Sequence, residues 1–112
     1  MLKTLDKVTM TVIETAPNGV VNSDTIFTFQ QTGNTVYGEY AGGKIRKGFL
    51  VGQMDGSILT FSYCQLQTDG ILDNGLSTCA LSVEGSGKIR LVEHFEWKSR
   101  PGEFGVNVFQ EI

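Results

Sequence analysis

Apolar and polar residues alternate in eight short segments of this chain, and glycine-containing steps separate most of the segments. Alternation with a period of two is typical of a half-buried β-strand, and no window has the apolar spacing of an amphipathic helix. Steps such as Gly33-Asn34 and Asp55-Gly56 favour tight hairpins. The segments that we expect to form strands are 8–14, 24–32, 35–41, 44–51, 57–67, 76–84, 88–98 and 104–112.

Eight strands joined by short connections form an antiparallel meander. A flat meander would leave two open edges, which promote aggregation, whereas pairing of the last strand with the first removes both. Gly38, Gly48 and Gly105 lie within strands and fit the sharp bends of a barrel. We therefore predict a single all-β domain over residues 1–112, an eight-stranded antiparallel up-and-down (meander) β-barrel. Such a barrel encloses a space that side chains nearly fill or that holds one small ligand.

One point of register stays open. Asp69-Gly70 and Asn74-Gly75 are both turn signals, so either step can separate the fifth strand from the sixth.

The same alternation predicts which side chains form the core. In the fourth segment, Ile45, Phe49 and Val51 share one face. The aromatic residues that lie on the more apolar face of their segments, and that we expect in the core, are Phe27, Phe29, Phe49, Phe61, Phe95 and Trp97.

Charge and composition exclude several classes of function. The 112 residues carry a formal net charge of −3 with both signs mixed along the chain, so we expect no nucleic-acid partner. No apolar run has the length of a signal peptide or of a membrane helix, so we expect a cytoplasmic protein with no membrane partner.

The two cysteines and the single histidine do not suggest a metal site. Without a CxxC pair and with only His94, we expect no metal and no cofactor. In a reducing compartment Cys64 and Cys79 are most simply two thiols, although their positions on neighbouring strands leave a cross-strand disulfide open. His94 alternates with charged residues, so we expect it to face water.

Glu93 is the most informative single residue. It shares a face with Leu91, Phe95 and Trp97, so we expect its carboxyl group inside the barrel with a raised pKa. There it needs a polar partner, for which a tyrosine, Gln65 or an arginine are the expected candidates. Glu93 would then be an anchor for a ligand, a general acid/base, or a structural element bonded to the interior.

Tyr63 and Gln65 share a face with two apolar residues, and Tyr40 can join them from the third segment. A few polar groups among aromatic rings are typical of ligand pockets, but small barrels also satisfy interior tyrosine hydroxyls in this way. No residue has the context of a catalytic nucleophile. The candidate ligand-binding residues are Glu93, Tyr63, Gln65, Tyr40 and Trp97.

Three stretches carry a resemblance to a known family: SDTIFTFQQTGNTVYGEYAGGKI, GKIRLVEHFEWKS and the terminal FQEI. On these the chain resembles uncharacterised bacterial proteins with an avidin-like or lipocalin-like small barrel, some of which carry the label N-acetylglutamate synthase. The resemblance implies the fold, because none of the three stretches contains a catalytic motif.

The activities of better-known comparable proteins do not transfer to these residues. Acetyl transfer from acetyl-CoA relies on a helix N-terminus that holds the pyrophosphate, and the chain has no such helix. Avidin-type biotin binders use several tryptophans where this chain has only Trp97, and the lipocalin G-x-W and fatty-acid-binder Arg-x-Tyr signatures are absent.

We therefore expect a barrel that binds a small ligand or a protein partner without catalysis. A second copy of the chain is one such partner, and the homodimer would form through the outer wall. The alternative is an enzyme that uses Glu93 as general acid/base beside Tyr63.

Overall fold

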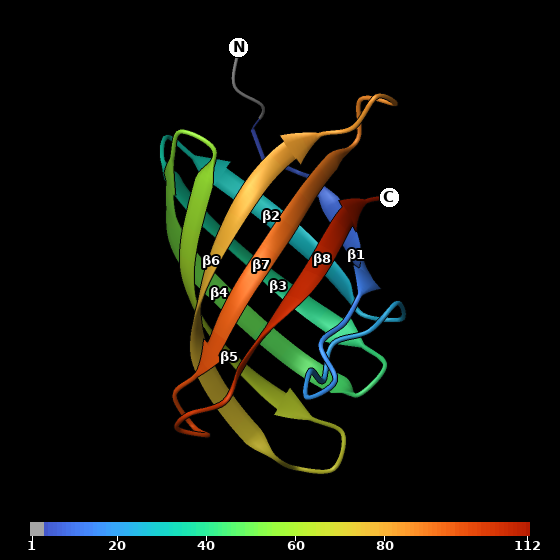
Figure 1. Ribbon diagram of the computed structural model, residues 1–112, viewed down its shortest axis with the longest axis vertical. Helices are drawn as coiled ribbons and strands as arrows, with labels where there is room; N and C mark the ends of the chain where they lie inside the picture. The colour runs from blue at the N-terminus through green and yellow to red at the C-terminus, as the bar shows by residue number, and fades with distance from the viewer. Residues whose placement is uncertain (1–3) are drawn as a thin grey trace.

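A computed structural model describes residues 4–112 of the chain. Eight strands follow one another around a closed antiparallel barrel, and β8 pairs with β1 (Figure 1). The predicted all-β barrel is thereby confirmed. Within the described residues no helix is long and apolar enough to cross a membrane. The strands are β1 (Thr9–Glu14), β2 (Ile26–Thr32), β3 (Thr35–Gly42), β4 (Ile45–Asp55), β5 (Ile58–Gln67), β6 (Leu72–Val83), β7 (Ile89–Trp97) and β8 (Phe104–Glu111).

The turn at residues 68–70 resolves the open register between β5 and β6. Gly70 has a φ of 90°, a left-handed conformation that glycine adopts easily. Asn74 and Gly75 instead lie inside β6, where Gly75 pairs with Tyr63. The expectation that the sixth strand begins at Leu76 was therefore wrong by four residues, and the difference brings Asp73 into the sheet.

A β-bulge reverses the predicted facing of β4. Ile45 pairs with Gln67 but Lys47 pairs with Leu66, so Arg46 is one extra residue on β4. Beyond the bulge the alternation is inverted, and Phe49 lies on the outer wall with 51% of its surface exposed. The prediction that Phe49 is a core residue was wrong for this reason, and so was its expected alignment with Ile45. The other five predicted core aromatics are buried: Phe27, Phe29, Phe61, Phe95 and Trp97.

Interior aromatic rings lie opposite glycines on the neighbouring strand. A Cβ atom at Gly48 would overlap the ring of Tyr40, and one at Gly105 would lie 2.6 Å from Cζ of Phe95. These glycines therefore make room for bulky rings inside a narrow barrel. The five cross-strand pairs are Phe29 with Gly38, Tyr40 with Gly48, Phe61 with Gly52, Tyr63 with Gly75, and Phe95 with Gly105.

The two cysteines are free thiols on opposite sides of the wall. Cys64 is exposed and Cys79 is buried. Because their side chains point to opposite faces of the sheet, the cross-strand disulfide left open by the sequence does not form. His94 is exposed, as expected.

Candidate functional site

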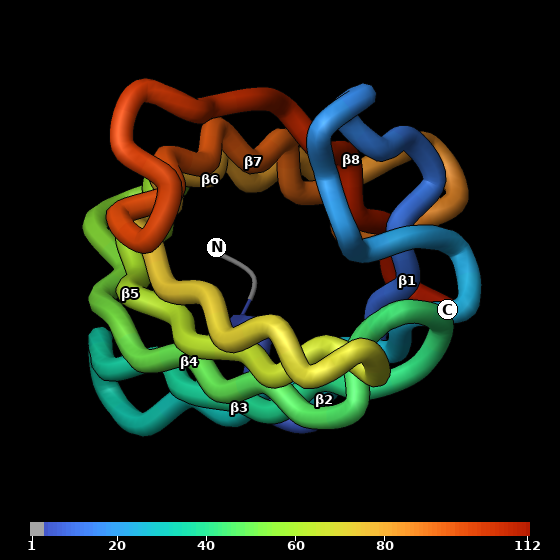
Figure 2. Tube along the Cα trace, turned by 90° about the horizontal axis from the view of Figure 1, so that it is seen from below, coloured from blue at the N-terminus to red at the C-terminus, as the bar shows by residue number. Residues whose placement is uncertain are grey.

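The two ends of the barrel differ. At one end residues 4–8 cross the opening, and Leu5 is fully buried while its backbone N–H donates to Gln31 Oε1 at 2.9 Å. We call the opposite end the mouth (Figure 2). The connections at the mouth are residues 15–25, which we call the mouth loop, and residues 43–44, 68–71 and 98–103.

The polar groups of the interior are not spread evenly. Every buried polar or charged side chain among residues 4–112 lies at the middle of its strand or toward the mouth. The half of the interior at the end opposite the mouth is apolar. The seven buried polar or charged residues are Thr25, Gln65, Gln67, Asp73, Ser77, Glu93 and Asn107.

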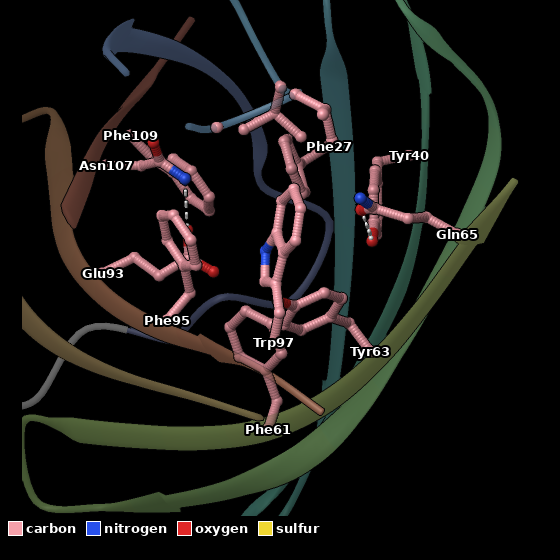
Figure 3. Close-up of a pocket in the computed structure, with 13 residues that line it drawn as sticks. Phe27, Tyr40, Phe61, Tyr63, Gln65, Glu93, Phe95, Trp97, Asn107 and Phe109 are labelled. Carbon is pink, nitrogen blue, oxygen red and sulfur yellow. Dashed lines mark hydrogen bonds between the residues drawn. The ribbon is translucent and has the colours of Figure 1, made fainter. Parts of the chain in front are cut away.

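A small cavity lies among these groups. Its volume is about 20 Å³, which is room for one or two water molecules. Val20 and Val21 of the mouth loop line part of it, and aromatic rings form much of the remaining wall (Figure 3). All five candidate residues predicted from the sequence line this one cavity: Tyr40, Tyr63, Gln65, Glu93 and Trp97.

Glu93 points into the barrel from the middle of β7, as predicted. Its partners differ from those expected, because Ser77 Oγ donates to Oε2 at 2.6 Å and Asn107 Nδ2 donates to Oε1 at 2.9 Å. The predicted partners, a tyrosine, Gln65 or an arginine, were therefore wrong. Burial raises the pKa of Glu93 and outweighs the two hydrogen bonds, which lower it.

Asn107 joins this carboxyl group to the mouth loop. Its Oδ1 accepts from the backbone N–H of Ala16 at 2.9 Å and from Thr15 Oγ1 at 3.2 Å. The side chain that orients Glu93 thus also holds the loop that lines the cavity.

Tyr40 and Gln65 form a buried pair on the wall opposite Glu93 (Figure 3). The Tyr40 hydroxyl donates to Gln65 Oε1 at 2.7 Å, and the Tyr40 ring stacks on Phe27 with centroids 4.4 Å apart. Burial, with a smaller effect from the charge of Glu93, raises the pKa of Tyr40, so its hydroxyl remains a donor.

Tyr63 is buried without a hydrogen-bond partner. No described atom accepts a hydrogen bond from its hydroxyl, although the residue is only 7% exposed. Burial and the charge of Glu93 raise its pKa, so this hydroxyl is also protonated at neutral pH. An unpaired buried hydroxyl is energetically unfavourable, and among residues 4–112 that line the cavity only Tyr63 has a fully buried polar side-chain atom without a partner.

An ion pair lies at one side of the mouth, between the start of β6 and the connection that follows β7. Arg100 Nη2 lies 2.7 Å from Asp73 Oδ2 and its Nε 3.1 Å from Oδ1, while its guanidinium group stacks 3.7 Å from the centroid of Trp97. Burial alone would raise the pKa of Asp73, but hydrogen bonds from Arg100, Ser99 and Gln67 outweigh it and lower the pKa.

Four residues of this region were not predicted from the sequence. Asn107 could have been found, since strand alternation places it on the same face as Phe109, and Ser77 shares a face with Cys79 in the same way. Asp73 lay outside the expected strands, between segments 57–67 and 76–84, and Arg100 lies in a connection whose conformation no periodicity predicts.

The residue types set limits on the chemistry of the site. Among residues 4–112 no three His, Cys, Asp or Glu side chains are grouped so that they could hold a metal ion. The cavity instead offers aromatic surfaces, neutral hydroxyl and amide groups, and one buried carboxyl group.

Comparison with known proteins identifies a family. A family model described as Avidin-like protein matches residues 3–112, which confirms the resemblance to avidin-like barrels inferred from the sequence. No curated protein and no solved structure matches the chain.

Proposed function

The chain belongs to the avidin-like protein family, and from this premise we propose that it binds a small ligand, without catalysis, in the mouth half of its barrel. The observation that carries the proposal is the division of the interior into an apolar half and a half in which polar groups and aromatic rings surround a cavity. A mixed wall of this kind is typical of ligand sites. An interior that only had to be filled would need no unpaired buried hydroxyl.

Ligand entry requires a movement of the mouth loop. The cavity of about 20 Å³ is smaller than any organic ligand, and Val20 and Val21 form its wall toward the mouth. A ligand of several heavy atoms would displace these side chains and occupy the space between the rings of Trp97 and Tyr40.

The contacts of Glu93 favour binding over the alternative of acid/base catalysis. Both carboxyl oxygens accept hydrogen bonds from Ser77 and Asn107. A general acid/base must reach a proton on the substrate, whereas these contacts hold Glu93 toward the wall. We therefore assign Glu93 the role of organising Asn107 and the mouth loop.

The single tryptophan provides the test. Trp97 lines the cavity, so its indole N–H signal in a ¹H–¹⁵N NMR spectrum reports on occupancy. We expect a fragment library to yield ligands that shift this signal. Val21→Phe, which adds bulk to the cavity wall, should weaken their binding, while the matched change Val51→Phe on the exposed outer wall should not. Fragments that bind only to the outer wall, or no binding at all, would contradict the proposed function.

A protein partner on the outer wall is the second candidate, and a second copy of the chain is its simplest form. Tyr37 and Val51 are cross-strand neighbours on this wall, and both are exposed beside Phe49. Clustered exposed apolar side chains favour an interface. Sedimentation velocity of the wild type and of the Phe49→Ser and Val51→Ser variants tests it: a dimer that dissociates in both variants supports the candidate, and a monomeric wild type contradicts self-association.

A further inference from the structure

The polar groups on the cavity wall are unequally satisfied. Glu93, Asn107 and Tyr40 all have partners within the barrel, whereas the hydroxyl of Tyr63 has none among the described residues. The Tyr63 ring packs edge-on against Phe61 with centroids 6.2 Å apart, and a Cβ atom at Gly75 would overlap its hydroxyl. The phenol is thus held between its neighbours with a protonated donor at its tip.

Gln65 adds a second donor to the same wall. Its Oε1 already accepts from Tyr40 at 2.7 Å, so the group that it can offer to a ligand is Nε2, which only donates. Tyr63 and Gln65 therefore both present donors to the cavity that they line.

The charges around the cavity favour neither an anion nor a cation. Arg100, the cation at the mouth, already forms two hydrogen bonds to Asp73. A buried anionic ligand would therefore lose its hydration and find no unpaired cation to compensate for that loss. A cationic ligand would have to compete with Ser77 and Asn107 for the oxygens of Glu93.

We propose that the ligand is a small neutral molecule whose carbonyl-type oxygen accepts a hydrogen bond from the hydroxyl of Tyr63. This inference rests on the proposed function and adds the chemical class of the ligand to it. The apolar part of the ligand would lie between the aromatic rings, and Gln65 Nε2 would be a second donor to its acceptor groups.

Two series of probes of matched shape test the proposed class. Acetamide, acetate and acetamidinium have only four heavy atoms and need little movement of the mouth loop. Benzamide, benzoate and benzamidinium are flat and larger. Each probe is titrated into the 112-residue protein while the Trp97 indole signal is followed by NMR. The titrations are repeated on Tyr63→Phe, which removes only the hydroxyl, and on the control Tyr37→Phe, which makes the same change on the outer wall.

We expect the amide of at least one series to shift the Trp97 signal and to bind more tightly than its acid and amidinium counterparts. Tyr63→Phe should weaken amide binding about five- to tenfold, the loss of one neutral hydrogen bond, and Tyr37→Phe should not. Thermal unfolding without probe separates this loss from damage to the fold, because removing an unpaired buried hydroxyl should not lower the melting temperature.

Three results would overturn the assignment. Equal binding of the neutral and charged probes, or unchanged amide binding by Tyr63→Phe, would refute the ligand class and leave the cavity as a binding site. Failure of both amides to shift the Trp97 signal would also refute the class, while the proposed function would still be judged by the fragment screen.

Discussion

Asn107 connects the buried carboxyl group of Glu93 to the mouth loop. Its Nδ2 donates to Glu93 Oε1 at 2.9 Å, and its Oδ1 accepts from the backbone N–H of Ala16 at 2.9 Å. A single side chain therefore bonds to an interior carboxyl group and anchors the loop that lines the cavity. Any change in the protonation of Glu93 acts directly on this anchor.

The first prediction concerns Asn107→Ala. This change leaves the buried N–H of Ala16 and one oxygen of Glu93 without partners, which should lower the free energy of unfolding by about 1–3 kcal/mol. Amide hydrogen exchange should also become faster within the mouth loop. Urea unfolding and exchange measured by mass spectrometry provide the two readouts.

The control is Asn18→Ala, which removes an exposed, 3.3 Å hydrogen bond from the same loop to the backbone oxygen of Phe104. If Asn107→Ala affected loop exchange no more than Asn18→Ala does, Asn107 would not be the anchor.

The second prediction concerns the pH dependence of stability. Because burial raises the pKa of Glu93 in the folded state, the folded protein keeps a proton that the unfolded chain loses near its ordinary pKa of 4.5. The contribution of Glu93 to stability is therefore complete below that pH and declines as the pH rises through the folded pKa. Glu93→Gln is neutral at every pH, so the variant should lose less stability than the wild type between pH 5 and pH 8.

Gln at position 93 can accept from Asn107 and donate to Ser77, so we expect the fold to persist. Urea unfolding at a series of pH values measures the effect, with Glu103→Gln in an exposed connection as the control. If the unfolding free energies of the wild type and Glu93→Gln changed in parallel with pH, this result would contradict a raised pKa of Glu93.

The third prediction concerns the glycines opposite the aromatic rings. In Gly48→Ala the new methyl group would overlap the ring of Tyr40, which should shift the Tyr40–Gln65 pair and destabilise the protein by about 1–3 kcal/mol. Gly85→Ala is the matched control, because a Cβ atom there meets no atom within 4 Å. Equal melting temperatures for the two variants would show that the barrel accommodates the methyl group at position 48.

Strand alternation was sufficient to predict the closed barrel and the inward direction of Glu93, Tyr63 and Gln65. It failed in β4, because the bulge at Arg46 inverts the facing of every later residue and leaves Phe49 outside. A bulge of this kind depends on how the neighbouring strand pairs, which local periodicity does not contain.

The partners of Glu93 could not be predicted for a related reason. Ser77 and Asn107 are 16 and 14 residues away in the sequence, on the two strands that flank β7. The register that places Glu93 opposite Cys79 and Asn107 is set by the connections of the two hairpins, β6–β7 and β7–β8, whose conformation the alternation does not contain. The sequence therefore identified residues that line the cavity but not the hydrogen bonds that organise them.

The last prediction concerns the ion pair at the mouth. The hydrogen bonds from Arg100, Ser99 and Gln67 outweigh burial and lower the pKa of Asp73 below its ordinary value of 3.8. The stabilisation by Asp73 is thus present above that value and is lost as the pH falls through the lower, folded pKa.

Asp73→Asn should destabilise the protein at pH 7 by about 1–3 kcal/mol, because it leaves Arg100 stacked on Trp97 without its carboxylate partner. The difference from the wild type should shrink as the pH falls from 3.8 through the lowered folded pKa, where the wild-type carboxylate also becomes protonated. Acid titrations of the unfolding free energy measure it, with Asp55→Asn in an exposed position as the control. A difference between Asp73→Asn and the wild type that stays constant down to pH 2 would show that the loss at pH 7 does not come from the charge of Asp73.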